Sequence, residues 1–263
     1  MFEAKLGSAG LLKKIVEAVK DLVTDAPFDC SEGSLSLQAM DSSHVALVSL
    51  KLEAHGFEAY RCDRTQNLGI SLATLSKFLK CAGNDDSCTL KYNDESDLMT
   101  LIFDANVGDK QQECEMKLMD LDAEHLGIPE QDYACVVTMP AGEFQKACRD
   151  LAMFTDTLQV VATKSGVQFS GKGDLGTHTV RWGQGANADN EEGVAIDLKE
   201  PVNITFAIKY MNLFTKATPL STTVSLSLSN DVPVVVEYQI EEFGYLRFYL
   251  APKIEDEEMT TDR

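Results

Sequence analysis

Basic side chains recur at helical spacing in this chain, and phosphate binding is the chemistry that they could supply. In the segment LLKKIVEAVKDLV, residues 11–23, Lys13 and Lys20 lie seven positions apart and therefore nearly on one line of a helix. Apolar residues occupy the opposite arc, so the pattern predicts an amphipathic helix whose polar face carries ammonium groups. One such face, taken alone, is typical of any solvated helix.

Three further segments have the same design. They are SLATLSKFLKCA at 71–82, PAGEFQKACRDLAMF at 140–154 and AIKYMNLFTKAT at 207–218. Their outward basic residues are Lys77, Lys80, Lys146, Arg149, Lys209 and Lys216. The formal net charge is −19, from 23 Lys and Arg against 42 Asp and Glu, so these basic faces stand out from an acidic background. The repetition favours one shared role for the four faces.

The motifs that could indicate catalysis are weak. GKGDLG at 171–176 matches the G-x-G-x-x-G phosphate pattern, but THTVRW, a strand pattern, follows where a dinucleotide site needs a helix. We therefore interpret it as a Gly-rich turn. The seven cysteines form no C-x-x-C pair and the four histidines show no ligand spacing. We predict free thiols, no metal, no cofactor and no enzymatic activity, and we interpret EDEE at 255–258 as an acidic tail.

Between the expected helices the apolar pattern changes to period two, as in HVALVSLKL at 44–52, which predicts antiparallel strands. A shift of 132 residues lays Ala9-Gly10 on Ala141-Gly142, which indicates an internal duplication. The sequence therefore predicts an α+β fold of two similar domains, each with antiparallel sheets and two helices. We place these domains at 1–117 and 135–258, joined by an acidic connecting loop at 118–134 and followed by a flexible tail at 259–263. No apolar run approaches the roughly 20 residues that span a bilayer, so we expect a soluble intracellular protein.

Six motifs carry a resemblance to a known family. They are QAMDSSHVALVSL at 38–50, YRCDR at 60–64, KLMDLD at 117–122, LGIPEQDY at 126–133, FTKATPLS at 214–221 and YLAPKIEDEE at 249–258. Together they resemble the proliferating cell nuclear antigen family, the eukaryotic DNA sliding clamps, over nearly the whole chain. The resemblance implies the DNA clamp fold, closing as a homotrimeric ring with strands outside and helices lining a pore around duplex DNA.

The resemblance also implies a function and its partners. The chain would be a nuclear processivity factor without catalysis of its own; the alternative is a subunit of a heterotrimeric checkpoint-type clamp. The implied partners are duplex DNA bound without sequence preference, further copies of the chain, replicative DNA polymerase, the clamp loader, flap endonuclease, DNA ligase and other proteins with a short clamp-binding peptide, the PIP box. No membrane partner is implied.

A ring that slides on DNA needs attraction to phosphates and no reading of base edges. Basic inner helices supply that attraction, while outer acids discourage DNA from binding outside the ring. By resemblance, the residues expected to meet DNA are Lys13, Lys14, Lys20, Arg61, Arg64, Lys77, Lys80, Lys110, Lys146, Arg149, Lys209 and Lys216. Lys14, nearly 100° around its helix from Lys13 and beside Asp21, is the weakest member of this set.

Two protein-binding surfaces follow from the same resemblance. The residues expected in a groove for the client peptide are Met40, His44, Val45, Leu47, Leu126, Ile128, Pro129, Tyr133, Val232, Pro233, Tyr249, Leu250, Ala251 and Pro252. Ring closure is expected from head-to-tail pairing of the strand near 109–117 with the strand near 175–182 of the next subunit. The residues expected at this interface are Cys81, Lys110, Cys114, Met116, Leu151, Met153, Leu175, His178 and Val180.

At two positions the chain departs from the family pattern. Cys114 stands where the family carries a bulkier aromatic residue, and Met153 stands where the family often carries a polar or basic residue. Lys164 stands where the family carries a lysine that accepts ubiquitin.

Overall fold

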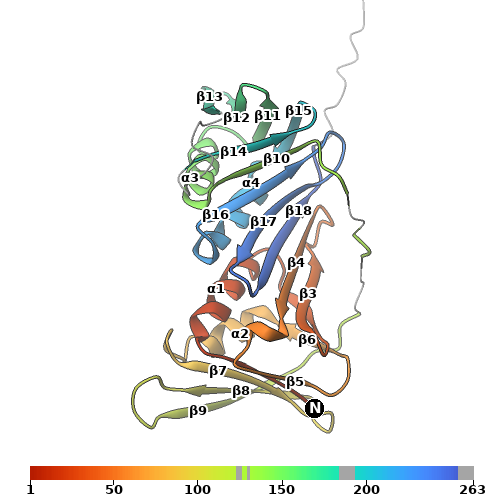
Figure 1. Cartoon of the computed structure of the whole chain (residues 1–263), viewed down its shortest axis with the longest axis vertical. Helices are drawn as coiled ribbons and strands as arrows, with labels where there is room; N and C mark the ends of the chain where they lie inside the picture. Colours follow the sequence, from red (N-terminus) through yellow and green to blue (C-terminus); the bar gives the residue numbers. More distant parts are fainter. Residues whose placement is uncertain (123–125, 129–130, 184–192, 254–263) are drawn as a thin grey trace, which may run out of the picture.

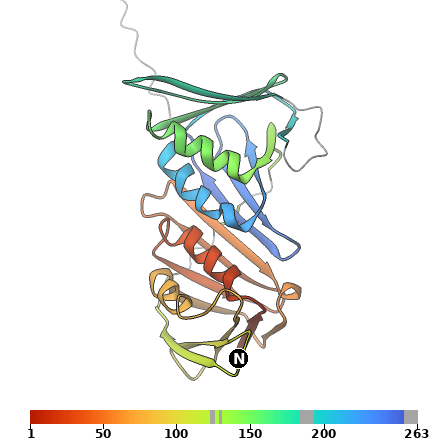
Figure 2. The same ribbon diagram turned by 90° about the vertical axis from the view of Figure 1, so that its left-hand side faces the viewer.

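A computed structural model of the chain describes residues 1–122, 126–128, 131–183 and 193–253 (Figure 1). The molecule is elongated, with sheets at both ends and a large sheet between them. The four helices gather on one side of this framework, and Figure 2, which looks onto that side, shows them following one another along the long axis. We call this side the helix face.

The helices are shorter than the sequence pattern predicts. They are α1 (Ala9–Val19), α2 (Leu72–Leu79), α3 (Ala141–Leu151) and α4 (Ile208–Phe214), with 3-10 helices at η1 (Ala54–Gly56) and η2 (Thr215–Leu220). The Ser8 side chain caps the start of α1 by accepting a hydrogen bond from the Gly10 N–H. After Val19 the chain tightens into a turn in which the Leu22 N–H bonds to the Val19 carbonyl, so the helix ends before the apolar periodicity does.

The strands form three sheets in which every paired strand is antiparallel. The first sheet has the order β5 (Ala59–Cys62), β1 (Phe2–Leu6), β7 (Ser87–Tyr92), β8 (Leu98–Asp104) and β9 (Gln111–Lys117). The second has the order β14 (Ala195–Leu198), β10 (Cys135–Pro140), β16 (Thr223–Leu228), β17 (Val234–Ile240), β18 (Gly244–Leu250), β4 (Ala46–Glu53), β3 (Ser34–Met40), β2 (Asp25–Cys30) and β6 (Gln66–Ser71). The third has the order β13 (Gly176–Gly183), β12 (Gly166–Gly173), β11 (Thr157–Thr163) and β15 (Val202–Ala207).

The predicted α+β architecture is confirmed: each half of the chain contains two helices, with antiparallel strands around and between them. The second sheet crosses from one half to the other, because β18 pairs with β4 in a register that places Phe248 opposite Val48. The two halves are therefore joined through backbone hydrogen bonds, which the apolar pattern of either strand could not reveal.

The described part of the connecting segment, residues 118–122, 126–128 and 131–134, contains no helix or named strand. Its start is attached to the second sheet, where the Met119 N–H donates to the Gly69 carbonyl at 2.8 Å. A Cβ on Gly69 would lie 2.1 Å from the Met119 carbonyl oxygen, so glycine is required for this close approach.

The GKGDLG segment forms a hairpin between β12 and β13, with Gly173 opposite Gly176. Gly176 has a φ of +142°, a conformation that favours glycine. The interpretation as a turn is confirmed, and a strand, not a helix, follows it. The EDEE run at 255–258 and the predicted tail at 259–263 lie outside the described residues.

The core lies between the helices and the sheets. Phe248 of β18 is fully buried and stacks on Phe214 of α4, with ring centroids 4.6 Å apart and an interplanar angle of 13°. Tyr238 of β17 packs edge-on against the Phe248 ring, with ring centroids 6.4 Å apart. These contacts hold α4 against the second sheet next to the β18–β4 junction.

No helix among the described residues has the length and apolar character needed to cross a membrane.

Replacing Phe248 by Ala should lower the free energy of unfolding by about 3–5 kcal/mol, because it removes a fully buried ring and leaves a cavity. Urea unfolding at a fixed protein concentration would measure the change. The matched control is Val107→Ala, because Val107 is 88% exposed and its truncation should leave the midpoint unchanged. Equal midpoints for the two variants would contradict this account of the core.

Candidate nucleic-acid interface and peptide groove

The helix face carries most of the basic residues that the sequence predicts for DNA contact. Exposed side chains on it are Lys14, Lys77, Lys80, Lys146, Arg149, Lys209 and Lys216, while Lys13 and Lys20 are half-buried. The apolar stripes of the helices turn the opposite way, into the core, as the periodicity predicts. The fold therefore gathers cations from all four helices and η2 on one side of a strongly acidic chain.

A polar cluster joins α1 to α2 and the loop after it. Lys13 Nζ donates to the Ala82 carbonyl at 2.6 Å and to Asn84 Oδ1 at 3.0 Å. Lys20 Nζ lies 2.7 Å from Glu17 Oε1, which also accepts from the Ser76 hydroxyl at 2.9 Å. The hydrogen bond from Lys20 lowers the pKa of Glu17 most, and Ser76 adds to the effect although partial burial opposes it. Glu17 is therefore an anion at neutral pH.

Arg61 and Arg64 are not brought to the helix face. Arg61 lies on β5, an outer strand of the first sheet, and its guanidinium Nε is 2.7 Å from Asp63 Oδ1. Arg64 follows β5 and pairs with Asp94 at 2.9 Å. Lys110 is exposed immediately before β9, at the other end of the same sheet. The motif YRCDR thus lies apart from the helix lysines, although it is close to α2 in sequence.

The residues predicted for the peptide groove come from four separated segments, namely the β3–β4 loop with the strand ends beside it, the connecting segment, the β16–β17 loop, and the end of β18 with the residues after it. Several apolar side chains among them are exposed: Val45 at 37%, Leu126 at 43% and Ile128 at 38%. Leu47 is 8% exposed, and His44, Val232, Pro233, Tyr249, Ala251 and Pro252 are at least partly accessible, as are Met40 and Tyr133. Pro129 lies outside the described residues.

Two predictions about side-chain direction need correction. Leu250 is fully buried, because burial alternates along β18 and places Tyr249 outward but Leu250 in the core. At the predicted subunit interface, Met116 lies on the inward phase of β9 and Leu151 on the apolar face of α3, so both side chains, 1% and 0% exposed, belong to the subunit's own core. The family resemblance assigns positions, but the direction of each side chain depends on the local strand or helix phase.

Asp41 shapes the β3–β4 loop and was missed by the sequence reasoning. Its carboxylate is buried and accepts hydrogen bonds from the N–H groups of Ser43, Val45 and Ala46 and from the Tyr210 hydroxyl at 2.8 Å. The Asp-Ser-Ser sequence is a turn signal that could have indicated the local bonds. Only the tertiary structure places Tyr210 of α4 beside Asp41.

Gln38 is a second residue that the sequence reasoning missed. Its side-chain Nε2 donates to the Leu126 carbonyl at 3.1 Å, and its Oε1 accepts from the Leu126 N–H at 2.8 Å. This two-bond attachment holds the connecting segment over the outer surface of β3. No local sequence signal identifies this attachment.

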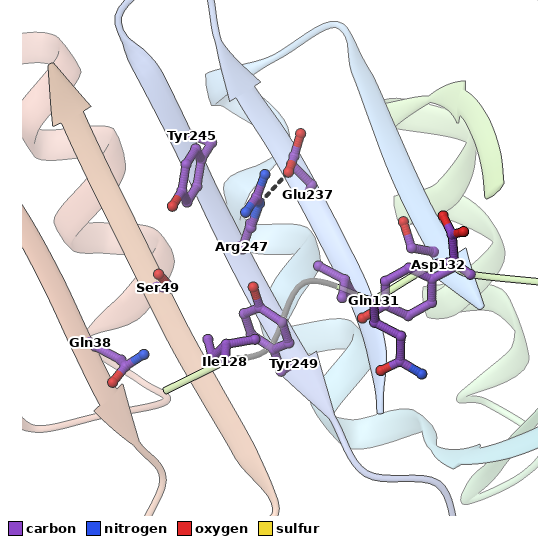
Figure 3. Close-up of a pocket in the computed structure, with 12 residues that line it drawn as sticks. Gln38, Ser49, Ile128, Gln131, Asp132, Glu237, Tyr245, Arg247 and Tyr249 are labelled. Atoms are coloured by element: carbon purple, nitrogen blue, oxygen red, sulfur yellow. Dashed lines mark hydrogen bonds and ion pairs between the residues drawn. The ribbon is translucent and has the colours of Figure 1, made fainter. Parts of the chain in front are cut away.

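A recess of about 920 Å³ lies between the connecting segment and the outer surface of the second sheet (Figure 3). Its walls are mainly polar. Glu237 of β17 pairs with Arg247 of β18, whose guanidinium carbon lies 3.9 Å from the centre of the Tyr245 ring. Ile128 and Tyr249 line the recess and also belong to the predicted groove, so the recess and the groove are continuous.

Among the described residues no group of acidic, Cys and His side chains could hold a metal ion.

The outer strands β9 and β13 are the ones expected to close a ring. Each is the last strand of its sheet in the described structure, so one side of its backbone lacks a strand partner. Near β13, Met153 and Leu175 are 66% and 86% exposed. His178 packs edge-on against Phe154 at 5.4 Å, and Val180 is half-buried.

On the β9 side, Cys114 is half-buried and Cys81 is exposed. Gln112 of β9 donates from its side chain to the Cys81 carbonyl at 3.0 Å, which ties the strand to the end of α2. Burial raises the pKa of the Cys114 thiol, and neighbouring Cys81 raises it further. The Cys114 side chain therefore stays a neutral thiol, a small apolar group on this edge.

The chain matches two family models. The one described as the N-terminal domain of proliferating cell nuclear antigen matches residues 1–125, and the one described as the C-terminal domain matches residues 127–253. The proliferating cell nuclear antigen of Caenorhabditis elegans is 65% identical over 260 residues, which cover 98% of this chain and 99% of the relative.

Replacing Asp41 by Asn should loosen the β3–β4 loop, because the amide nitrogen cannot accept the hydrogen bonds that one carboxylate oxygen accepts. We expect faster hydrogen exchange at the Val45 and Ala46 amides and a loss of about 1.5–3 kcal/mol in the free energy of unfolding. Ser42→Ala is the control, since Ser42 is exposed on the same loop. Unchanged exchange in Asp41→Asn would contradict the assignment.

The same carboxylate predicts a pH dependence. Burial alone would raise the pKa of Asp41, but the hydrogen bonds from Ala46, Tyr210, Val45 and Ser43 together outweigh it, so the pKa lies below its ordinary value. The stabilisation is therefore complete above the unfolded pKa of about 3.9 and is lost as the pH falls through the folded value. Asp41→Asn should remove this contribution to acid unfolding.

Proposed function

This chain belongs to the proliferating cell nuclear antigen family, and from that premise we propose which of its residues perform the work of a sliding clamp. It is a processivity factor that encircles DNA, assembles with itself into a trimer and binds polymerase and other replication and repair proteins. It is not an enzyme. Both family models and the relative favour this function over that of a checkpoint-type clamp subunit.

The observation that supports our residue assignment is the helix face, where cations from α1, α2, α3, α4 and η2 gather in a chain of net charge −19. DNA presents phosphates along its whole length, so a basic wall attracts it without regard to sequence. Topological enclosure holds the ring on DNA, and weak contacts then suffice because strong ones would oppose sliding. A helix about 10 Å across and a sheet packed about 10 Å from it separate this face from the far side of the subunit. This thickness exceeds the Debye length of about 8 Å, so acids on the far side weaken the attraction only in part.

We assign the DNA contacts to the helix-face residues and leave Arg61 and Arg64 out of this set. Both arginines lie on the β5 side of the first sheet, apart from the four helices. Lys14 stays in the set, because Asp21 pairs with Lys216 and not with Lys14. Lys110 lies beside β9, where it belongs to the subunit boundary as well as to the approach to DNA.

Ring closure is proposed through β9 of one subunit and β13 of the next. Pairing these outer strands would extend the first sheet into the third and satisfy backbone groups that are otherwise open to solvent. It would also cover the exposed side chains of Met153 and Leu175. The head-to-tail contact is heterologous, and a closing rotation turns it into a ring. Cys81, Cys114, His178 and Val180 are the further residues that we place there.

Client peptides are proposed to bind in the groove between the β3–β4 loop, the connecting segment and the residues after β18. Three or four apolar anchors at about 1.5–3 kcal/mol each, less the cost of ordering the peptide, give binding in the micromolar range. Asp41 and Gln38 hold two walls of this groove in place through the hydrogen bonds described above. Micromolar binding suits a platform on which many clients exchange.

Three assignments rest on the family alone. We propose the two clamp domains at 1–117 and 135–258 with the connecting loop at 118–134, and we place the protein in the nucleus. Lys164 is exposed in the turn between β11 and β12, which makes it accessible for the ubiquitin attachment that the family position suggests. A complete ring should stay on circular DNA and leave linear DNA through its free ends.

Changing Lys20, Lys77, Lys80 and Arg149 together to Ala should flatten the salt dependence of DNA association. Each lost phosphate contact lowers the slope of log K against log salt by about 0.9. The control removes four lysines from the outer sheets and their surroundings, namely Lys5, Lys51, Lys91 and Lys199. If the two quadruple variants show the same slope while both still form trimers, the helix face is not the DNA surface.

Replacing Ile128 by Ala should weaken binding of a PIP-box peptide about tenfold, because it removes part of a partly exposed apolar anchor beside Tyr249. Fluorescence anisotropy with a labelled peptide would measure the affinity, and trimer formation should be unaffected. Val107→Ala serves as the control for loss of an exposed aliphatic side chain elsewhere. Wild-type peptide affinity in Ile128→Ala would remove this residue from the groove.

A further inference from the structure

Among the carboxylates near the ammonium groups of the helix face, two come from α1 and the turn after it. Glu17 lies within α1 and Asp21 follows the helix by two residues. Glu17 Oε1 is 2.7 Å from Lys20 Nζ, and Asp21 Oδ2 is ion-paired with Lys216 of η2. Lys20 and Lys216 are both among the residues assigned above to DNA. Each of them therefore has an acidic partner before any phosphate arrives.

Glu17 pairs with Lys20 at the end of its own helix, whereas Asp21 pairs with Lys216 of another element. This helix packs against α2 on one side and against η2 and α4 on the other. Glu17 also accepts from the Ser76 hydroxyl of α2 at 2.9 Å. The pKa of Glu17 is lowered, by its bond to Lys20 first, so the carboxylate is charged when the ring works. A single helix thus supplies anions to both halves of the helix face.

The two ion pairs are not needed to hold the helices together. The side chains of Glu17 and Asp21 are 50% and 45% exposed, and exposed ion pairs contribute little to stability because water and salt screen them. The apolar stripe of α1, including Leu12, Ile15 and Val16 at 1% exposure, provides the packing instead. Exposure leaves the same carboxylates open to competition from a passing phosphate.

Other cations on the helix face differ in this respect. Within the described ranges, Lys77, Lys80 and Lys146 have no carboxylate at ion-pair distance, whereas Arg149 has only the more distant Asp150 oxygen at 3.6 Å. The helix face therefore contains unpaired cations beside cations whose charge is offset by α1. The cations of the helix face therefore differ in how much of their charge is offset by a nearby carboxylate.

We propose that Glu17 and Asp21 tune the grip of the ring on DNA by competing with phosphates for Lys20 and Lys216. When a phosphate approaches, it must displace a carboxylate, so the net gain from each of these contacts is small and the contact is short-lived. This inference rests on the assignment of the helix face to DNA. It predicts that the acids make DNA binding weaker and sliding faster than the lysines alone would.

The test uses the full trimer with Glu17→Gln and Asp21→Asn combined, since both changes keep side-chain shape and remove only the charge. Each freed lysine that reaches a phosphate should steepen the salt slope by about 0.9, which is about a threefold larger loss of affinity between 50 and 200 mM salt. The matched control, Glu32→Gln with Glu95→Gln, removes the same charge from two exposed turns. Single-molecule tracking on closed circular DNA gives the diffusion constant.

Tighter binding, a steeper slope and slower diffusion in the Glu17/Asp21 variant, without these effects in the control, would support the inference. If the variant forms trimers but matches the control in slope and diffusion while the lysine-and-arginine variant still flattens the slope, the tuning inference fails and the DNA assignment stands. If that quadruple variant also leaves the slope unchanged, both fail together. Thermal unfolding of the variant should match that of the wild type, because a structural role would lower its midpoint.

Discussion

The antiparallel pairing of β18 with β4 carries the organisation of the whole subunit, since it joins the two halves of the chain in one sheet. Helices from both halves pack against the same side of this framework, so their polar faces point in one direction. A flexible joint between the halves would allow the helix faces to turn independently. The rigid junction is therefore what converts four separate amphipathic helices into one basic surface.

The same junction positions the surface that we propose for client peptides, on a different side of the molecule. The groove residues come from the β3–β4 loop, from the connecting segment and from the end of β18, and these lie together only because β18 is the neighbour of β4. Asp41 attaches the β3–β4 loop to α4 by accepting from the Tyr210 hydroxyl, and Gln38 attaches the connecting segment to β3. The buried Asp41 carboxylate is suited to this task, because breaking any one of its bonds leaves an unsatisfied group.

Positive and negative charges are distributed unevenly over the molecule, which the composition alone does not show. A net charge of −19 would predict repulsion from DNA, yet the helix face collects cations and the excess acid lies largely elsewhere. The local arrangement of charge therefore decides the partner, while the net charge opposes non-specific binding to the exterior. Under our proposal, Glu17 and Asp21 also weaken the attraction of the basic surface, as suits a ring held on DNA by enclosure.

The sequence by itself determined the fold class, the four amphipathic helices, the duplication, the turn at 171–176 and, through its motifs, the family. These depend on local periodicity and short-range turn chemistry, which can be identified from the order of the residues. The tertiary structure alone decided which side chains meet. It placed Arg61 and Arg64 away from the helix face, turned Leu250 into the core, and brought Tyr210 to Asp41 and Lys216 to Asp21. Such contacts join residues far apart in the chain, and no local pattern encodes them because only long-range packing sets the distance between the elements.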